Sequence, residues 1–273
     1  MRVRRRFAQH FLERPWVDKL VERIEARPDD VFLEIGPGRG ALTLALAPLV
    51  GSVYAVEIDR DLARDLAALA PSNVHVVAAD ALQVDLASLL PQRADGGGRL
   101  RVTGNLPYNV TSPMLARLFA LYCQRNDVVD AVLMLQREVV DRLVAVPGTK
   151  QYGALTVRTR LHADAHHVLS LPPGAFRPKP KVASAVVRLV FRPPPVKLPD
   201  PAAFDLLVTG LFTQRRKMLL NSLSPLIDPD GPSARDRLAA AGIDPTRRPE
   251  TLELGEFADL VKVCGPIRNP AVL

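Results

Sequence analysis

The sequence predicts an α/β protein with a doubly wound, mainly parallel sheet, followed by a small all-helical domain. From residue 31 onward, short apolar runs alternate with segments in which leucines repeat at helical spacing, a pattern typical of parallel strands joined by crossover helices. After residue 191, a proline-rich stretch is followed only by helical patterns. The 273 residues, 48% hydrophobic and 24% charged, suffice for one large domain with a small companion.

Each element is predicted from its local pattern. Five apolar runs are the expected strands, in chain order Val31–Ile35, Val53–Ile58, Val74–Ala78, Leu100–Gly104 and Val129–Leu135. Leucines at helical spacing predict helices near residues 42–49 and 62–69, between the first three strands. Val186–Phe191 is expected as a last strand at an edge of the sheet.

A linker is predicted between the two domains. The run from Arg192 to Pro199 contains four prolines, which remove hydrogen-bond donors and exclude a helix or a central strand. Beyond it, Phe204, Leu207 and Leu211 fall on one helical face. We therefore expect a cofactor-binding catalytic domain over residues 1–192 and a small helical domain over residues 198–273.

Charge is unevenly distributed along the chain. The formal net charge of +7 divides into +4 over residues 1–27, −2 over residues 28–176 and +5 over residues 177–273. Basic ends around a nearly neutral middle favour a polyanionic partner, nucleic acid before membrane. On charge alone, a protein from an arginine-rich proteome explains the pattern equally well.

Several classes of protein are not expected. No apolar run is long enough to span a membrane and the basic N-terminus lacks a secretion signal, so a cytoplasmic protein is predicted. Cys123 and Cys264 lack the spacing of a disulfide framework or a zinc site, and both are expected in the core. The five histidines show no ligand spacing, so no metal is expected. A monomer is the default expectation.

A glycine-rich turn follows the first strand, and acidic residues end the next two. Gly36 and Gly38 let the backbone approach a ligand, and the next helix begins with amides that suit an anionic group. Glu57 lies about 20 residues later, where a carboxylate can bind both hydroxyls of a ribose. Asp80, followed by Ala81, could accept from an adenine amino group or cap a helix. The pattern predicts an adenosine-containing cofactor, either a methyl donor or a nicotinamide dinucleotide; a structural turn with no ligand is the third alternative.

The fourth strand ends in residues suited to a purine amine. The lone pair of such an amine is delocalised into the ring, so the nitrogen must be re-aimed before it can react. The Asn105 side-chain oxygen and the Leu106 carbonyl offer two acceptors for its hydrogens. Pro107 keeps Leu106 extended, and Tyr108 offers a ring for stacking. These residues favour methyl transfer over hydride transfer; a β-turn with a core tyrosine is the alternative.

The order of motifs resembles that of a known family, the KsgA-type small-subunit rRNA adenine N6,N6-dimethyltransferases. Residues 7–225 carry the resemblance, through Gln9-His10-Phe11-Leu12, Glu34 to Gly40, Glu57, Asp80-Ala81, Asn105 to Tyr108, Leu135 to Glu138, Tyr152-Gly153, Phe176 to Val182 and Phe212 to Leu219. His10 replaces the usual asparagine, a departure that affects only one side-chain contact. The resemblance implies a Rossmann-like class I S-adenosylmethionine-dependent methyltransferase sheet with a small all-helical C-terminal domain.

The resemblance also implies roles for single residues. The target-base pocket would contain Asn105, Leu106, Pro107, Tyr108 and Phe176, and the cofactor would contact Gln9, His10, Leu12, Gly36, Gly38, Glu57, Asp80, Ala81 and Asn105. Phe176 would stack on the adenine face opposite Tyr108. Because prolines flank Phe176 on both sides, we expect its ring to be exposed; a core phenylalanine is the alternative.

Two groups of basic residues are candidates for contacts with RNA phosphates. One group flanks the expected pocket and contains Arg4, Arg5, Arg6, Lys179 and Lys181; the other ends the first helix of the second domain and contains Arg215, Arg216 and Lys217. Solvated charged faces are the alternative explanation for both groups.

Together these observations predict an enzyme. By the resemblance, it would use S-adenosylmethionine to dimethylate N6 of two adjacent adenosines near the 3′ end of small-subunit (16S) rRNA, with small-subunit rRNA and the small ribosomal subunit as partners. Three alternatives stay open: a large-subunit rRNA adenine N6-methyltransferase of the resistance type, a nicotinamide-dependent dehydrogenase, and a non-enzymatic ribosome-assembly factor.

Overall fold

The computed structural model describes residues 10–92, 98–107, 110–125 and 127–269. The chain forms two compact units, one of residues 1–140 and 164–192 and one of residues 141–163 and 193–273. The second unit thus includes segment 141–163, which was expected in the first domain.

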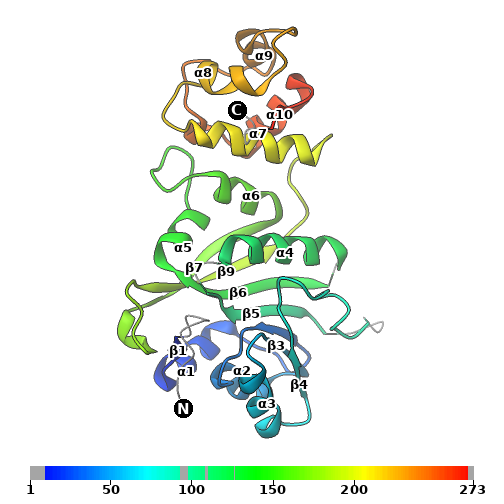
Figure 1. Cartoon of the computed structure of the whole chain (residues 1–273), viewed down its shortest axis with the longest axis vertical. Coiled ribbons are helices and arrows are strands. Elements are labelled where there is room, and N and C mark those ends of the chain that lie inside the picture. Colours follow the sequence, from blue (N-terminus) through cyan, green and yellow to red (C-terminus); the bar gives the residue numbers. More distant parts are fainter. Residues whose placement is uncertain (1–9, 93–97, 108–109, 126, 270–273) are drawn as a thin grey trace. The chain divides into compact units, whose positions relative to one another are not determined.

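A seven-stranded sheet in the order β4-β3-β2-β5-β6-β9-β7 forms the centre of the first unit (Figure 1). Its strands are β2 (Val31–Ile35), β3 (Ser52–Glu57), β4 (Val74–Ala78), β5 (Leu100–Asn105), β6 (Val128–Gln136), β7 (Ala163–Leu171) and β9 (Ser184–Phe191). The strands β2 to β6 pair in parallel, and β9 pairs antiparallel with β6. A separate two-stranded ladder joins β1 (Phe11–Leu12) to β8 (Phe176–Arg177). The predicted α/β class is confirmed, and the five expected strands are present, with β4 at one edge of the sheet.

Helices lie before, between and after the parallel strands. They are α1 (Arg14–Ile24), α2 (Ala41–Leu46), α3 (Arg60–Leu69) and α4 (Thr111–Gln124), followed by α5 (Arg137–Leu143) after β6. Helix α3 begins after Asp59, whose carboxylate accepts from the Asp61 and Leu62 amides and so caps the first turn. Leu62 and Leu66 are buried on the inner face of α3, as their spacing predicts.

Two expectations about the periphery of the first unit are wrong. β9 was expected at an edge of the sheet, but it lies between β6 and β7, and β7 forms that edge. The segment of β7 was not predicted as a strand, because exposed polar residues such as His166 and His167 interrupt its apolar pattern. Cys123 was expected in the core and is exposed, whereas Cys264, in the second unit, is buried as expected.

The second unit is helical. It contains α6 (Ala154–His162), α7 (Pro201–Thr213), α8 (Leu219–Leu223), α9 (Ala234–Ala240) and α10 (Leu254–Cys264). Helix α7 packs against α6, α8 and α10 (Figure 1), and Phe204, Leu207 and Leu211 lie in the core that they share. Tyr152 lies in the same core, where its hydroxyl donates to the Leu252 carbonyl at 2.7 Å.

The segment between β9 and α7 contains neither helix nor strand from residue 192 to residue 200. Prolines prevent regular pairing there, as the sequence predicts. No helix in the described part of the chain is both long and apolar enough to cross a membrane.

Candidate active site

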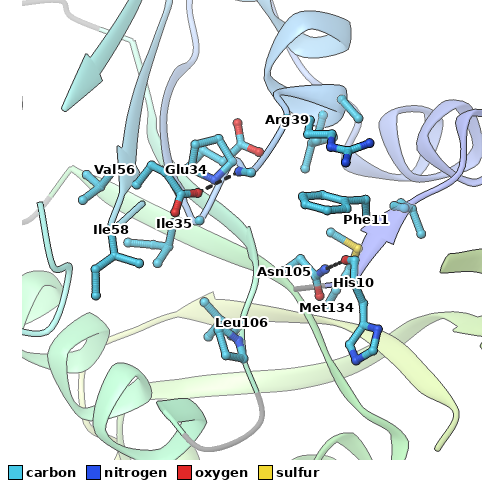
Figure 2. A pocket seen from close by; sticks show the side chains of 18 of the residues that line it. His10, Phe11, Glu34, Ile35, Arg39, Val56, Ile58, Asn105, Leu106 and Met134 are labelled. Atoms are coloured by element: carbon cyan, nitrogen blue, oxygen red, sulfur yellow. Dashed lines mark hydrogen bonds between the residues drawn. The ribbon is translucent and has the colours of Figure 1, made fainter. Parts of the chain in front are cut away.

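A pocket of about 820 Å³ lies at the carboxyl ends of the parallel strands (Figure 2). The strand order reverses between β2 and β5, and ligands of doubly wound sheets bind outside such a reversal. The residues that the sequence placed at the cofactor and the amine converge here. Those described in the structure are His10, Leu12, Gly36, Gly38, Glu57, Asp80, Ala81, Asn105, Leu106, Pro107 and Phe176.

The glycine-rich turn adopts a backbone that favours glycine. Gly36 and Gly38 have φ angles of 69° and 59°, in the left-handed region that residues with a side chain rarely occupy. A Cβ on Gly38 would lie 3.0 Å from the Phe11 ring, so β1 packs closely on the turn. The Arg39 guanidinium lies 4.5 Å from the centre of the same ring (Figure 2). Phe11 thus anchors the N-terminal segment to the turn.

Glu57 is held by two backbone amides at the end of β3. Its Oε2 accepts from the Gly38 amide at 2.9 Å, and its Oε1 accepts from the Asp59 amide at 2.9 Å. Each oxygen keeps a second lone pair that a ligand hydroxyl can use. Burial raises the pKa of Glu57, although these two bonds act in the opposite direction. The Gly38 and Asp59 amides therefore hold the Glu57 carboxylate in a fixed orientation before any ligand binds.

Glu34 is a buried acid for which the sequence predicted no separate role. It is 2% exposed, and the Thr43 hydroxyl donates to its Oε2 at 2.6 Å. Burial raises the pKa of Glu34 to about 7, and the neighbouring Glu57 acts in the same direction. The carboxyl of Glu34 is thus far easier to protonate than that of an exposed glutamate.

Asp80 and its neighbours form the wall of the pocket at the end of β4. The Asp80 Oδ1 accepts from the Leu82 amide at 2.9 Å, so Asp80 caps a turn and not the helix that the sequence left open as an alternative. Ala81 and Leu82 line the pocket beside it, as does the half-exposed Ile58 from the end of β3. These apolar side chains, together with the carboxylate, suit a purine ring that carries an amino group.

Asn105 and Leu106 end β5 directly beside the glycine-rich turn. The Asn105 side-chain nitrogen donates to the His10 carbonyl at 2.8 Å (Figure 2). The Leu106 amide donates to the Met134 carbonyl at 3.2 Å, which fixes the peptide before Leu106. A Cβ on Gly104 would lie 2.5 Å from the Ile35 carbonyl, so glycine permits the close approach of β5 to β2 at this end.

The aromatic part of the expected base pocket differs from the prediction. Phe176 was expected to be exposed, but it is 1% exposed, because β8 pairs with β1 and places the ring between the pocket and the core. Tyr108 and Gln9 lie outside the described residues. The stacking arrangement therefore stays a prediction.

The basic residues predicted for RNA contact lie in different places. Lys179 and Lys181 are exposed just after β8, and Arg4, Arg5 and Arg6 lie outside the described residues. In the second unit, Arg215 binds the Glu250 carboxylate at 2.5 Å and the Thr149 carbonyl at 3.0 Å. Arg216 and Lys217 beside it are exposed.

A second pocket, of about 950 Å³, lies beside the basic segment of the second unit, which consists of Arg215, Arg216 and Lys217. Two further cations, Lys150 and Arg248, line it together with Arg215, Arg216 and Lys217. The sequence did not predict them, because isolated basic residues far apart in the chain converge only after folding.

Met114 and Met134 of the first pocket were missed because single apolar residues of a helix and a strand resemble core positions.

The chain resembles known proteins over almost its whole length. Residues 1–264 match the family model of ribosomal RNA adenine dimethylases. The chain is 43% identical over 266 residues to the Ribosomal RNA small subunit methyltransferase A of Acinetobacter baylyi, covering 95% of this chain and 91% of that protein. It is 41% identical over 262 residues to the protein of the same name from Xylella fastidiosa, covering 94% of each.

Solved structures agree with these relatives. A dimethyladenosine transferase from Plasmodium falciparum superposes with a TM-score of 0.74 at 25% identity, covering 93% of this chain and 96% of that one. The 23S rRNA methyltransferase ErmE superposes with a TM-score of 0.64 at 26% identity, covering 93% of this chain and 99% of that one. Fold and pocket together define a class I methyltransferase. The chain belongs to the ribosomal RNA adenine dimethylase family, which confirms the resemblance drawn from its motifs.

Proposed function

We propose that this enzyme uses S-adenosylmethionine to dimethylate N6 of two adjacent adenosines near the 3′ end of small-subunit (16S) rRNA, and so takes part in the biogenesis of the small ribosomal subunit. One observation carries the proposal. Asn105 and Leu106 line a pocket that also contains the glycine-rich turn and the oriented Glu57 carboxylate. Amine acceptors therefore lie beside a site suited to an adenosyl group.

The residues of the pocket fit S-adenosylmethionine. Glu57 would bind the ribose hydroxyls with the lone pairs that its two amide bonds leave. Asp80 would accept from the adenine amino group between Ile58 and Leu82. The glycine-rich turn, with the backbone near His10 and Leu12, would bind the methionine part. When bound, S-adenosylmethionine supplies an activated methyl group, so the protein needs only to position the acceptor.

Orientation of the target amine is the chemical task of Asn105 and Leu106. Two acceptors placed in advance would hold the two hydrogens of the amine and point its lone pair toward the methyl group. Pro107 keeps Leu106 extended. The proton can leave after methyl transfer, when the methylated nitrogen is strongly acidic. No dedicated general base is required of Glu34 or Glu57.

Phe176 would contact the target adenine. Its ring lines the pocket from β8, and a flipped-out base commonly lies between aromatic or apolar side chains. With Tyr108 on the opposite face, the base would be stacked on both sides. Because the Phe176 ring is buried in the structure, we expect a shift of the ring when the base enters.

The RNA would also contact exposed cations outside the pocket. Lys179 and Lys181 follow β8 directly, and Arg4, Arg5 and Arg6 belong to the N-terminal segment that precedes β1. In the second unit, Arg216 and Lys217 are exposed. Such residues bind phosphates and do not read bases, so they would hold the substrate without setting the target nucleotide.

The proposal is tested by incubating unmethylated small subunits and unmethylated large subunits, each with labelled S-adenosylmethionine, followed by mass mapping of the rRNA. We expect two dimethylated adenosines near the 3′ end of 16S rRNA. Label in 23S rRNA alone would support the large-subunit alternative. Binding of NAD without binding of S-adenosylmethionine would support the dehydrogenase, and binding of subunits with no label transferred would leave an assembly factor.

Asn105→Ala tests the amine-orienting role. We expect the rate of methyl transfer to fall roughly 10²-fold or more, as on removal of one positioned polar group, while the affinity for S-adenosylmethionine changes less. Asn221→Ala, at an exposed asparagine on α8, is the matched control and should keep full activity. An unchanged rate in Asn105→Ala would remove the orienting role.

A further inference from the structure

We propose that His10 is a positioning residue for the amine acceptor. Its backbone carbonyl orients the Asn105 amide, and its imidazole fixes that carbonyl against the segment that carries Phe176. The inference rests on the proposed function, because the orientation matters only if Asn105 receives a substrate amine. It assigns to His10 a role other than the cofactor contact that the sequence predicts.

The first step is the orientation of the Asn105 amide. The side-chain nitrogen donates to the His10 carbonyl at 2.8 Å. A carbonyl oxygen can only accept, so chemistry alone requires the nitrogen to face His10. The Oδ1 of Asn105 must then point away from His10 (Figure 2). Without this bond the amide could turn by 180°, since the terminal torsion of asparagine is broad, and would present a donor to the amine.

The second step is the placement of the His10 carbonyl. Phe11 pairs with Arg177 in the β1–β8 ladder, and the Glu13 amide donates to the Ala175 carbonyl at 2.9 Å. Hydrogen-bonded and non-hydrogen-bonded pairs alternate along such a ladder. Continuing the alternation places His10 at a non-hydrogen-bonded position, so its carbonyl faces away from β8. That direction agrees with the bond from Asn105.

The third step is the imidazole. The ladder would next place His10 opposite Pro178, at a position where neither backbone bonds across the ladder. The His10 Nδ1 lies 2.7 Å from the Pro178 carbonyl. Because this carbonyl only accepts, Nδ1 must carry a proton. The side chain thus adds one bond beyond the end of the ladder and limits the movement of its own backbone.

The resulting chain of contacts has a functional consequence. It runs from the Pro178 carbonyl through the His10 ring and backbone to the Asn105 amide, and Pro178 lies two residues after Phe176. The Asn105 oxygen that would accept from the target amine is thereby linked to the segment that contains Phe176, the expected stacking ring. Loosening His10 should lower the fraction of molecules whose Asn105 Oδ1 is correctly aimed, which affects kcat more than binding.

Two substitutions at His10 separate the effect of the N–H donor from the effect of the size of the side chain. His10→Asn keeps an N–H donor at a position close to that of Nδ1, and His10→Phe keeps a ring of similar size without a donor. We expect His10→Phe to lower kcat about tenfold, equivalent to the loss of one hydrogen bond. The KM for the RNA substrate and the Kd for S-adenosylmethionine should change less than about threefold, because the bond acts on orientation and not on binding. His10→Asn should restore most of kcat. Equal kcat in both variants, or a loss confined to the Kd, would overturn the proposal.

A second readout does not depend on activity. The side-chain NH₂ signals of Asn105, assigned by their absence in Asn105→Ala, should show protection from hydrogen exchange in the wild-type protein and in His10→Asn. In His10→Phe the protection should fall. Unchanged protection would refute the link to His10, whichever RNA the wild-type protein methylates. If the wild-type protein transfers no methyl group but the amide protection follows the expected pattern, the proposed function is refuted. The link between His10 and the Asn105 amide then still holds.

Asn105→Asp provides an independent variant if His10→Phe fails to fold. An aspartate keeps acceptor oxygens but cannot donate to the His10 carbonyl. If orientation through His10 matters, Asn105→Asp should lose about tenfold or more in kcat, because one hydrogen bond alone is worth about that much. Wild-type kcat in this variant would contradict the proposal.

Discussion

At the scale of single residues, Glu34 shows how burial changes the chemistry of a common side chain. It lies within β2, so its carboxyl is enclosed while the chain continues to the glycine-rich turn. The Thr43 hydroxyl on α2 donates a hydrogen bond to it. The cost of burying the charge exceeds this gain, so the pKa rises to about 7.

This pKa predicts how stability depends on pH. Between the unfolded value of 4.5 and about 7, the folded protein holds a proton on Glu34 that the unfolded chain has released. The folded state therefore binds more protons, and the free energy of unfolding falls as pH rises through this window. Glu34→Gln removes the effect. The free energy of unfolding of Glu34→Gln, taken relative to that of the wild type, should rise by up to about 3 kcal/mol from the low to the high end of that window. Urea unfolding without ligand measures this difference.

Thr43→Val is the companion variant for this measurement. It removes the hydroxyl that stabilises the charged form of Glu34, so its stability should fall more with rising pH than that of the wild type. If the difference in stability between Glu34→Gln and the wild type is constant over the whole range, the raised pKa is wrong.

At the scale of elements, a buried arginine joins β5 to its surroundings. Arg101 on β5 binds Asp130 on β6 through two nitrogens, at 2.7 and 2.6 Å, and Asp30 at 3.1 Å. It also donates to the Ile24 and Glu25 carbonyls at the end of α1. All five N–H groups of the guanidinium are used. Arg101 thus links β5, the strand that ends in Asn105, to β6 and to the end of α1.

Arg101→Met should destabilise the protein by about 3–5 kcal/mol, because it removes the bidentate partner of the buried Asp130 and one partner of the buried Asp30. Urea unfolding at neutral pH measures the loss. Arg99→Met is the control: Arg99 also binds Asp30, at 2.8 Å, but its side chain is 32% exposed, so we expect a smaller loss of about 1 kcal/mol. Equal losses in the two variants would show that burial of the ion pair is not the deciding factor.

At the scale of the whole molecule, the basic groups lie in both compact units. Lys179 and Lys181 belong to the unit with the sheet, and Arg216 and Lys217 belong to the helical unit. Arg215 differs from its neighbours because it already binds Glu250 within its own unit. Binding of RNA phosphates by either group would make the affinity depend strongly on salt.

Removal of Arg216 and Lys217 together should weaken binding of the small subunit and reduce its dependence on salt. The slope of log K against log salt should become shallower by up to about one for each phosphate that is no longer neutralised. Filter binding over a range of salt concentrations measures this slope. Lys262→Ala, which removes an exposed lysine that pairs with Asp259 on α10, is the control and should leave the slope unchanged. If the double variant keeps the wild-type slope, these two residues do not bind phosphate.

The strands that form the site were predictable, and the far edge of the sheet was not. β2, β3 and β5 are apolar runs because both faces of a parallel sheet are covered, and the polar last residues of β3 and β5, Glu57 and Asn105, mark the carboxyl edge. β7 carries exposed polar residues along much of its length, so its pattern resembles that of a loop. It becomes a strand because β9, which follows it in the chain, offers it hydrogen bonds. The local sequence pattern therefore could not show which strand forms this edge of the sheet.

The order of motifs along the chain determined the class of fold and the family, because strand ends and glycine turns are local features with fixed chemistry. Tertiary structure alone decided the burial of Phe176, the convergence of Lys150 and Arg248 with the basic segment, and the bond between Asn105 and the His10 carbonyl. Each of these depends on which distant segments meet after folding. Contacts of that kind follow from packing of the whole chain and leave no local pattern in the residues that make them.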